Sequence, residues 1–339
     1  MKRLLFIVGY LYIIIGVHAE TLISVSDYFV TPEMYGVKSG ICEDPVSNAD
    51  SLQLAVDCAI STGRKLVSRG DKYYYIGKSI HINGALEADW GRATIVATDT
   101  INMIEIDYKT QIKWFGCLSG FVLDMNGIAK RGIHCSNAVK MHITDGDIKN
   151  VSRGGIGLQI DNGYEMVVDN VHFDAVADYA TGLKITTSDC HFSDCIMINC
   201  KTAIDNYGSN MYDRIHAWIG NKGDWLRGSV FFLSRGGESF LSQCCSDTFE
   251  KVFLITTPVN LFISQHKNFH NTKMWKMDPE SISAVMFCFS EERAAKNSKI
   301  YLNNSSIGGL FLGGKNRQSF SNYDGLGIIS SACKITIVR

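Results

Sequence analysis

The sequence has little proline, no excess of positive charge and no pair of cysteines at metal-binding spacing. Its 339 residues include 4 prolines and 31 glycines, a balance typical of many short strands that turn without proline. The formal net charge is -1, which gives no support for nucleic-acid binding, since that needs a basic face, and we expect no nucleic-acid partner. Apolar residues make up 46% of the chain, which argues against a disordered protein.

The cysteines do not form a zinc motif. There are 11, an odd number for a fully paired secreted framework, and no two have CxxC spacing. We therefore expect no metal and no other cofactor. Several occupy strand positions where apolar residues are expected: Cys190, Cys195, Cys200 and Cys244. This pattern predicts small buried hydrophobes stacked inside the fold, and it leaves some disulfides open.

Long apolar runs are absent outside the N-terminus. Lys2 and Arg3 precede the apolar run Leu4–Val17, and Val17-His18-Ala19 is a small-residue cleavage site. The run is short for a bilayer span, so a removable signal peptide over residues 1–19 is favoured over an uncleaved anchor. We expect a secreted, periplasmic or cell-surface protein with no integral membrane segment after signal removal.

Residues 20–92 combine a helical pattern with short strands. The expected elements are a helix with apolar residues at Leu52, Ala55, Val56 and Ala59, capped by Asn48 or Asp50 and ended by Gly63, and strands at 65–67 and 73–76.

From about 93 to 256 the chain repeats a pattern every 21 to 28 residues or so. The clearest copies place a glycine before two apolar residues separated by a variable one: Gly132–Cys135, Gly157–Ile160 and Gly182–Ile185. Repeats of this length with two or three short strands and no helix predict a solenoid of stacked parallel strands. An antiparallel sandwich is less favoured, because hairpin dipeptides such as Asn-Gly are rare. Residues 257–339 repeat less clearly and are expected to form irregular final coils or a C-terminal cap, with strands at 261–263, 286–289 and 335–338.

Two segments carry a family resemblance. Met34–Val37 followed by Ser51–Asp57, with Tyr74-Tyr75-Ile76, resembles the N-terminal cap of the pectate-lyase-like superfamily. Gly120–Gly127 resembles the coil that opens the body of bacteriophage tailspike depolymerases and related exported bacterial proteins. The resemblance covers roughly residues 30–256. It implies an all-β, right-handed parallel β-helix with an N-terminal α-helical cap, a polysaccharide partner and, as in related β-helices, a homotrimer.

The resemblance does not specify a reaction, because the superfamily includes lyases, hydrolases, epimerases and proteins without activity. The usual Asp-Asp-Thr before the cap helix is replaced by residues 47–50, and neither a polygalacturonase-type aspartate set nor a pectate-lyase-type calcium cluster is evident. Tailspikes do not ordinarily carry a signal peptide, which favours a cellular, exported relative.

In a solenoid, equivalent outward positions on successive coils form columns. The repeats predict three: His134, Gln159, Lys184 and Asp205; Asp169, Ser193, Asp213 and Ser242; and Asp147, His172 and His216. Such columns are also what an ordinary solvated sheet face looks like. The functional alternative centres on residues 205–238, where aromatic rings and charged groups suited to sugar binding are dense. The candidate substrate-binding residues are Arg214, Trp218, Trp225, Arg235, Glu238 and Lys184.

Two reactions fit these residues. Inverting hydrolysis needs two carboxyls about 6.5–9.5 Å apart, which suits Asp169 and Asp213 on alternate coils, and Asp205 beside Asp213 would give the shorter retaining distance. β-Elimination would use His216 as the base, with Arg214 or Arg235 on the uronate. The sequence thus predicts an enzyme that cleaves a capsular, exo- or cell-surface polysaccharide. The alternatives are a non-catalytic polysaccharide-binding or adhesin-like β-helix and a polymer-level sugar epimerase.

Overall fold

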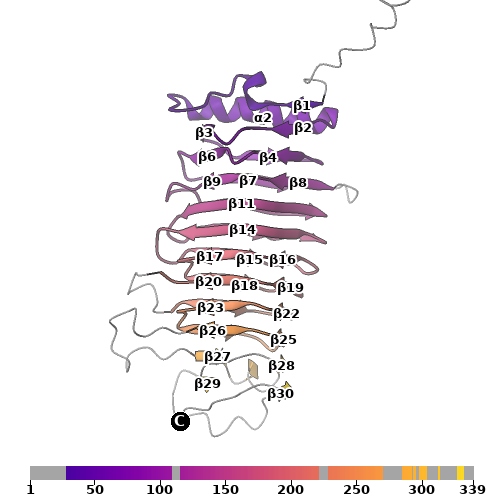
Figure 1. Ribbon diagram of the computed structural model, residues 1–339, viewed down its shortest axis with the longest axis vertical. Helices are drawn as coiled ribbons and strands as arrows, with labels where there is room; N and C mark the ends of the chain where they lie inside the picture. The colour runs from indigo at the N-terminus through magenta and orange to yellow at the C-terminus, as the bar shows by residue number, and fades with distance from the viewer. Residues whose placement is uncertain are drawn as a thin grey trace, which may run out of the picture.

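The chain winds into a column of stacked coils, with the α-helix α2 (Pro45–Thr62) across its N-terminal end (Figure 1). The computed structural model describes residues 28–108, 115–220 and 228–269, and shorter stretches at 285–291, 293–294, 298–303, 312–313 and 327–331. The expected signal peptide, residues 1–19, lies outside the described residues.

Parallel strand pairing runs along the whole column, which confirms the parallel β-helix. One sheet has 11 described strands. They are β4 (Ile80–Ile82), β7 (Asn102–Asp107), β10 (Arg131–Val139), β12 (Ile156–Ile160), β13 (Gly163–Tyr164), β15 (Thr181–Ile185), β18 (Thr202–Asn206), β21 (Val230–Ser234), β24 (Lys251–Ile255), β27 (Val285–Phe289) and β29 (Leu312–Gly313). We call this sheet the narrow sheet.

The other sheet has 19 described strands in two arms that share two long strands. The first arm holds β1 (Phe29–Val30), β2 (Lys65–Val67), β5 (Glu87–Asp89), β8 (Gly116–Ser119), β16 (His191–Ser193), β19 (Asn210–Asp213), β22 (Glu238–Ser242), β25 (Asn260–Ser264), β28 (Lys299–Asn303) and β30 (Gly327–Ser331). The second arm holds β3 (Tyr73–Ile76), β6 (Thr94–Ala97), β9 (Val122–Asp124), β17 (Ile196–Ile198), β20 (His216–Trp218), β23 (Cys245–Asp247) and β26 (Lys267–Phe269). The shared strands are β11 (Met141–Val151) and β14 (Val167–Ala175).

A single residue in the left-handed conformation turns the chain from the first arm to the second in coil after coil. These corner residues have φ between 51° and 55° and are Asp145, Asn170, Asp194, Arg214, Gln243 and Gln265. Left-handed backbone is unfavourable for side chains other than glycine, asparagine and aspartate. The sharp corner is therefore maintained by stacking of the coils, and in these six coils it projects a polar side chain.

The helix α2 begins earlier than the sequence predicted. Asp44, and neither Asn48 nor Asp50, is its N-cap: the Asp44 Oδ1 accepts a hydrogen bond of 2.9 Å from the Ser47 amide, with Pro45 at the first helical position. Asn48 is buried and donates instead to the Tyr75 carbonyl at 3.0 Å. Gly63 ends the helix at φ 65°, as expected.

The parallel ladder begins within the segment expected to be the cap. Strands β2 and β3 cover the two predicted strands at 65–67 and 73–76, and both already pair with the next coil. At the other end, β25 and β27 contain the predicted strands at 261–263 and 286–289 and continue the stack. The predicted strand at 335–338 lies outside the described residues.

Inward-pointing side chains of successive coils stack on one another and form a continuous core. Phe253 stacks on Phe287 with ring centroids 5.2 Å apart, and Phe192 stacks on Tyr212 at 5.1 Å. The cysteines behave as predicted: Cys135, Cys190, Cys195, Cys200 and Cys244 are buried, and the ten described cysteines are free thiols. Burial raises the pKa of Cys195 and Cys244 to about 12, so these thiols are inert core residues.

Candidate functional site

Two outward columns run side by side down the first arm of the wide, 19-stranded sheet. The apolar column consists of Val167, His191, Met211, Phe240, Phe262 and Tyr301. The polar column consists of Asp169, Ser193, Asp213, Ser242 and Ser264. Each strand contributes to both columns two residues apart, so the columns lie about 7 Å apart and repeat about every 4.8 Å.

The apolar column becomes an aromatic stack toward the C-terminus. Phe240 and Phe262 lie with centroids 4.7 Å apart and planes at 9°, and Phe262 and Tyr301 lie at 4.5 Å and 2°. Each ring in the stack covers a face of the next ring. The face of Phe240 on the Met211 side is therefore the one at which the stack ends. Met211 is 47% exposed and Phe240 is 41% exposed. Large apolar groups this exposed on successive coils form a patch rather than scattered surface residues.

A pocket of about 410 Å³ opens beside this end of the stack. Its lining residues are Glu165, Met166, Val167, Asp189, Cys190, His191, Ser209, Asn210, Met211 and Phe240. Apolar side chains therefore line the pocket together with acids, a histidine and a hydroxyl, which supply hydrogen-bonding groups. This mixture is typical of small-molecule and sugar sites. The buried Asn210 amide is already hydrogen-bonded to Thr187, Asn206 and Cys190. The apolar column and the pocket were not predicted from the sequence, although an outward apolar residue two positions before an outward polar one, in Met211–Asp213 and Phe240–Ser242, was the available signal.

Arg214, one of the corner residues, links the polar column to the corner residue Asp194 of the preceding coil. Its guanidinium makes a two-pronged contact with Asp194, at 2.7 Å from Nε and 2.6 Å from Nη2, and pairs with Asp213 through Nη1. The hydrogen bond from Arg214 lowers the pKa of Asp194, and the same bond raises that of Arg214. The guanidinium is therefore already paired with two carboxylates of this chain, which offset its positive charge.

The predicted alternate-coil carboxylates occupy the expected register. Asp169 aligns with Ser193, and Ser193 aligns with Asp213, so the two acids are two coils apart, about 9.6 Å along the column. Asp169 accepts a hydrogen bond from the Ser193 hydroxyl, while Asp213 contacts Arg214. Both acids are half-buried on the outer face.

Asp205 lies elsewhere. It belongs to β18 in the narrow sheet, whereas Asp213 belongs to β19 in the wide sheet. Asp205 is 8% exposed and is held by Arg235, with Nε 2.7 Å from Oδ1. Burial lowers the pKa of Arg235, but the hydrogen bond to Asp205 and the negative charges of Asp205 and Tyr207 together outweigh it and raise the pKa. Arg235 also lies over the Tyr207 ring at 5.2 Å, so this is a separate structural cluster.

The column His134, Gln159, Lys184 and Asp205 has the predicted register on the narrow sheet. At its N-terminal end, His134 contacts Glu105 through Nδ1 and Asp161 through Nε2, each at 2.8 Å. Both ring nitrogens of His134 are thus engaged with carboxyl groups of this chain. The polar groups here are engaged with one another.

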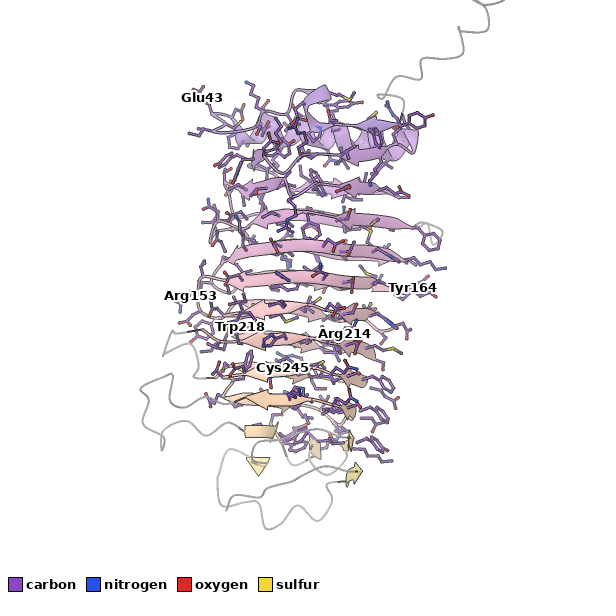
Figure 2. All side chains as sticks on the ribbon, viewed as in Figure 1. Glu43, Arg153, Tyr164, Arg214, Trp218 and Cys245 are labelled. Carbon is purple, nitrogen blue, oxygen red and sulfur yellow. The ribbon has the colours of Figure 1, made fainter. Side chains whose placement is uncertain are left out.

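His216 and Trp218 lie on β20 in the second arm, with ring centroids 4.8 Å apart. Figure 2 shows Trp218 and Arg214 on the same coil, with Cys245 on the next. Burial lowers the pKa of His216, an effect that Asp247 opposes. The predicted column Asp147, His172 and His216 has the expected register, with Ile196 between the histidines. Arg235, the second arginine considered for elimination, follows a strand of the narrow sheet.

Two more predicted substrate-binding residues remain. Glu238 begins β22, is exposed, and accepts a hydrogen bond of 2.8 Å from the Asn260 amide, two residues before Phe240 in the same strand. Trp225 lies outside the described residues. Of the predicted site residues that the structure describes, Asp169, Asp213, Arg214 and Glu238 lie on one face, and Lys184, Asp205, His216, Trp218 and Arg235 lie elsewhere.

The described residues contain no group of three or more acidic, histidine or cysteine side chains arranged to hold a metal. In the same part of the chain, no helix combines the length and apolarity that membrane crossing requires.

The likeness of this chain to known proteins lies in its fold. No family model matches the sequence, and no curated protein matches it. The fold is similar to that of the gp42 tailspike of Acinetobacter phage vb_AbaP_AS12, with a TM-score of 0.49 and 13% sequence identity. The alignment covers 93% of this chain and 64% of the tailspike, so the chain spans less than two thirds of that protein's length.

Proposed function

We propose that this protein binds a polysaccharide lengthwise on the first arm of the wide sheet. One observation carries the proposal: an exposed apolar column and a hydrogen-bonding column run in parallel over successive coils. Sugar rings have apolar faces and hydroxyl edges, and the two columns offer matching groups about 7 Å apart. We expect one sugar unit to bind in the pocket at Phe240 and Met211.

A binding screen with a matched pair of variants tests this proposal. Phe240→Ala removes the end of the aromatic stack, and we expect affinity for the bound polysaccharide to fall about two- to twelvefold, since aromatic contacts contribute roughly 0.5–1.5 kcal/mol beyond area burial. Tyr73→Ala removes another exposed aromatic residue, on β3 near the cap, and should leave affinity unchanged. Equal affinity of Phe240→Ala and the parent protein would refute the site.

Hydrolysis of the bound glycan is the second candidate function. The observation in its favour is the register that sets Asp169 and Asp213 two coils apart on the binding face, since inverting hydrolases separate their carboxyls by about 6.5–9.5 Å. The ion pair of Asp213 with Arg214 argues against a free acid at that position, so binding without cleavage is the stronger proposal. Release of reducing ends by the parent protein and its loss in Asp213→Asn would establish hydrolysis; no release from a polymer that binds would exclude it.

Export is part of the same proposal, because a surface glycan is met outside the cytoplasm. The basic and apolar segment 1–19 supports it. Recovery of the protein from the culture medium, with a new N-terminus at Glu20, would establish export; retention of the segment in the cytosolic protein would exclude it.

A further inference from the structure

The charges around the binding face are mostly negative. The acids on or beside the two columns are Glu165, Asp169, Asp189, Asp194, Asp213 and Glu238. Asp189 and Glu238 are exposed, and the Glu165 side chain is 57% exposed. Their potentials add at a surface, so a polymer approaching the columns meets a negative field.

The basic groups beside these columns do not compensate. Arg214 is held between Asp194 and Asp213, and Lys140 pairs with Glu165 at 3.2 Å. Lys299 is exposed, but it lies at the far end of the aromatic stack, two coils beyond Glu238 in the register. The described part of this face therefore offers no arginine fork or lysine at the pocket to receive a carboxylate or sulfate.

Anionic polysaccharides repeat their charge at short intervals. A polyuronate laid along the columns would bring a carboxylate near Asp189, Asp213 or Glu238 on successive coils, and like charges brought together without a partner disfavour binding. A glycan without negative charge meets no such repulsion and can still use the apolar stack and the hydroxyl groups of Ser193 and Ser209.

We propose that the polysaccharide bound on this face lacks anionic groups, being a polymer of neutral or amino sugars rather than a uronate-rich or sulfated glycan. This inference rests on the proposed polysaccharide binding. It also makes elimination at a uronic acid unsuitable for this site, since that reaction requires the substrate carboxylate to be neutralised.

The test is a binding screen with two sets of polymers at low and high salt. The first set contains galactomannan, arabinoxylan, dextran, hydroxyethyl cellulose and chitosan, and the second contains polygalacturonate, alginate, hyaluronan and dextran sulfate. Whichever neutral polymer binds is then carboxymethylated, and we expect this derivative to bind at least about tenfold more weakly than its parent at low salt. High salt should reduce this difference, because it screens the exposed acids.

The outcomes separate the two proposals. A neutral or amino-sugar polymer that binds, is weakened by Phe240→Ala and loses affinity on carboxymethylation supports both. A second-set polymer that binds equally well or better, with the same sensitivity to Phe240→Ala, overturns the charge inference and leaves polysaccharide binding intact. Binding of no polymer from either set refutes the proposed function, and the charge inference falls with it.

Discussion

The buried histidine His266 predicts a specific acid sensitivity of this β-helix. His266 is 0% exposed and lies among aromatic rings, 5.4 Å from Phe231 and 5.5 Å from Phe253, with the Ser246 hydroxyl 3.1 Å from Nε2. Burial lowers the pKa of His266 to about 3, against an ordinary value of 6.5. The ring is therefore neutral in the folded protein at physiological pH.

The direction of this pH effect on stability follows from the different pKa values of His266 in the folded and the unfolded chain. Between pH 6.5 and pH 3, the unfolded chain binds a proton at this histidine and the folded chain does not, so acid favours unfolding. The full stability is present above pH 6.5. At pH 5 the loss is about 1.5 pH units times 1.36 kcal/mol, or about 2 kcal/mol.

Urea unfolding followed by circular dichroism at pH 7.5 and pH 5 measures this term. His266→Gln carries no titrating group, and we expect the parent protein to lose about 2 kcal/mol more than this variant between the two pH values. The variant's own starting stability does not matter, because only the pH-dependent differences are compared. His142→Gln, which changes an exposed histidine on β11, is the matched control and should behave as the parent. Equal pH dependence in the parent protein and His266→Gln would refute the reasoning.

Two other predictions concern the packing and the polar network. A Cβ at Gly146, on β11, would overlap the buried Phe121 ring, so Gly146→Ala should destabilise the protein by about 1–3 kcal/mol in urea unfolding; an unchanged midpoint would show that the ring can move. Burial raises the pKa of Asp161, but hydrogen bonds from Gln159 and His134 outweigh it and hold that pKa below 3.8. Ionised Asp161 therefore stabilises the folded protein above pH 3.8, and this stability is lost as the pH falls through the folded-state pKa. Asp161→Asn should thus lose less stability between pH 5 and pH 3 than the parent protein. An identical slope would contradict the role of the Gln159 and His134 hydrogen bonds.

Much of the fold follows from local pattern. Alternating apolar residues require one side of each strand to face the interior, and the recurring glycine marks equivalent points on successive coils. The three predicted columns therefore have the observed register. The core cysteines Cys190, Cys195, Cys200 and Cys244 were predictable for the same reason, since each takes an inward apolar position. The N-cap of α2 could not be predicted from local pattern. Asn48 and Asp44 are both good capping residues, and the choice between them depends on the tertiary contact of Asn48 with Tyr75.

The candidate site depended on three-dimensional packing. The repeat alone predicts which residues share a column. Because the repeat length varies, however, the sequence does not show that Asp205 and Asp213 belong to different sheets. Nor does it show that the corner directs Arg214 onto Asp194, twenty residues earlier and one coil away. The sequence by itself determined a stack of parallel coils, because burial of a period-two apolar pattern has few solutions. Only the tertiary structure decided which outward side chains meet, because contacts between coils join residues that are distant along the chain.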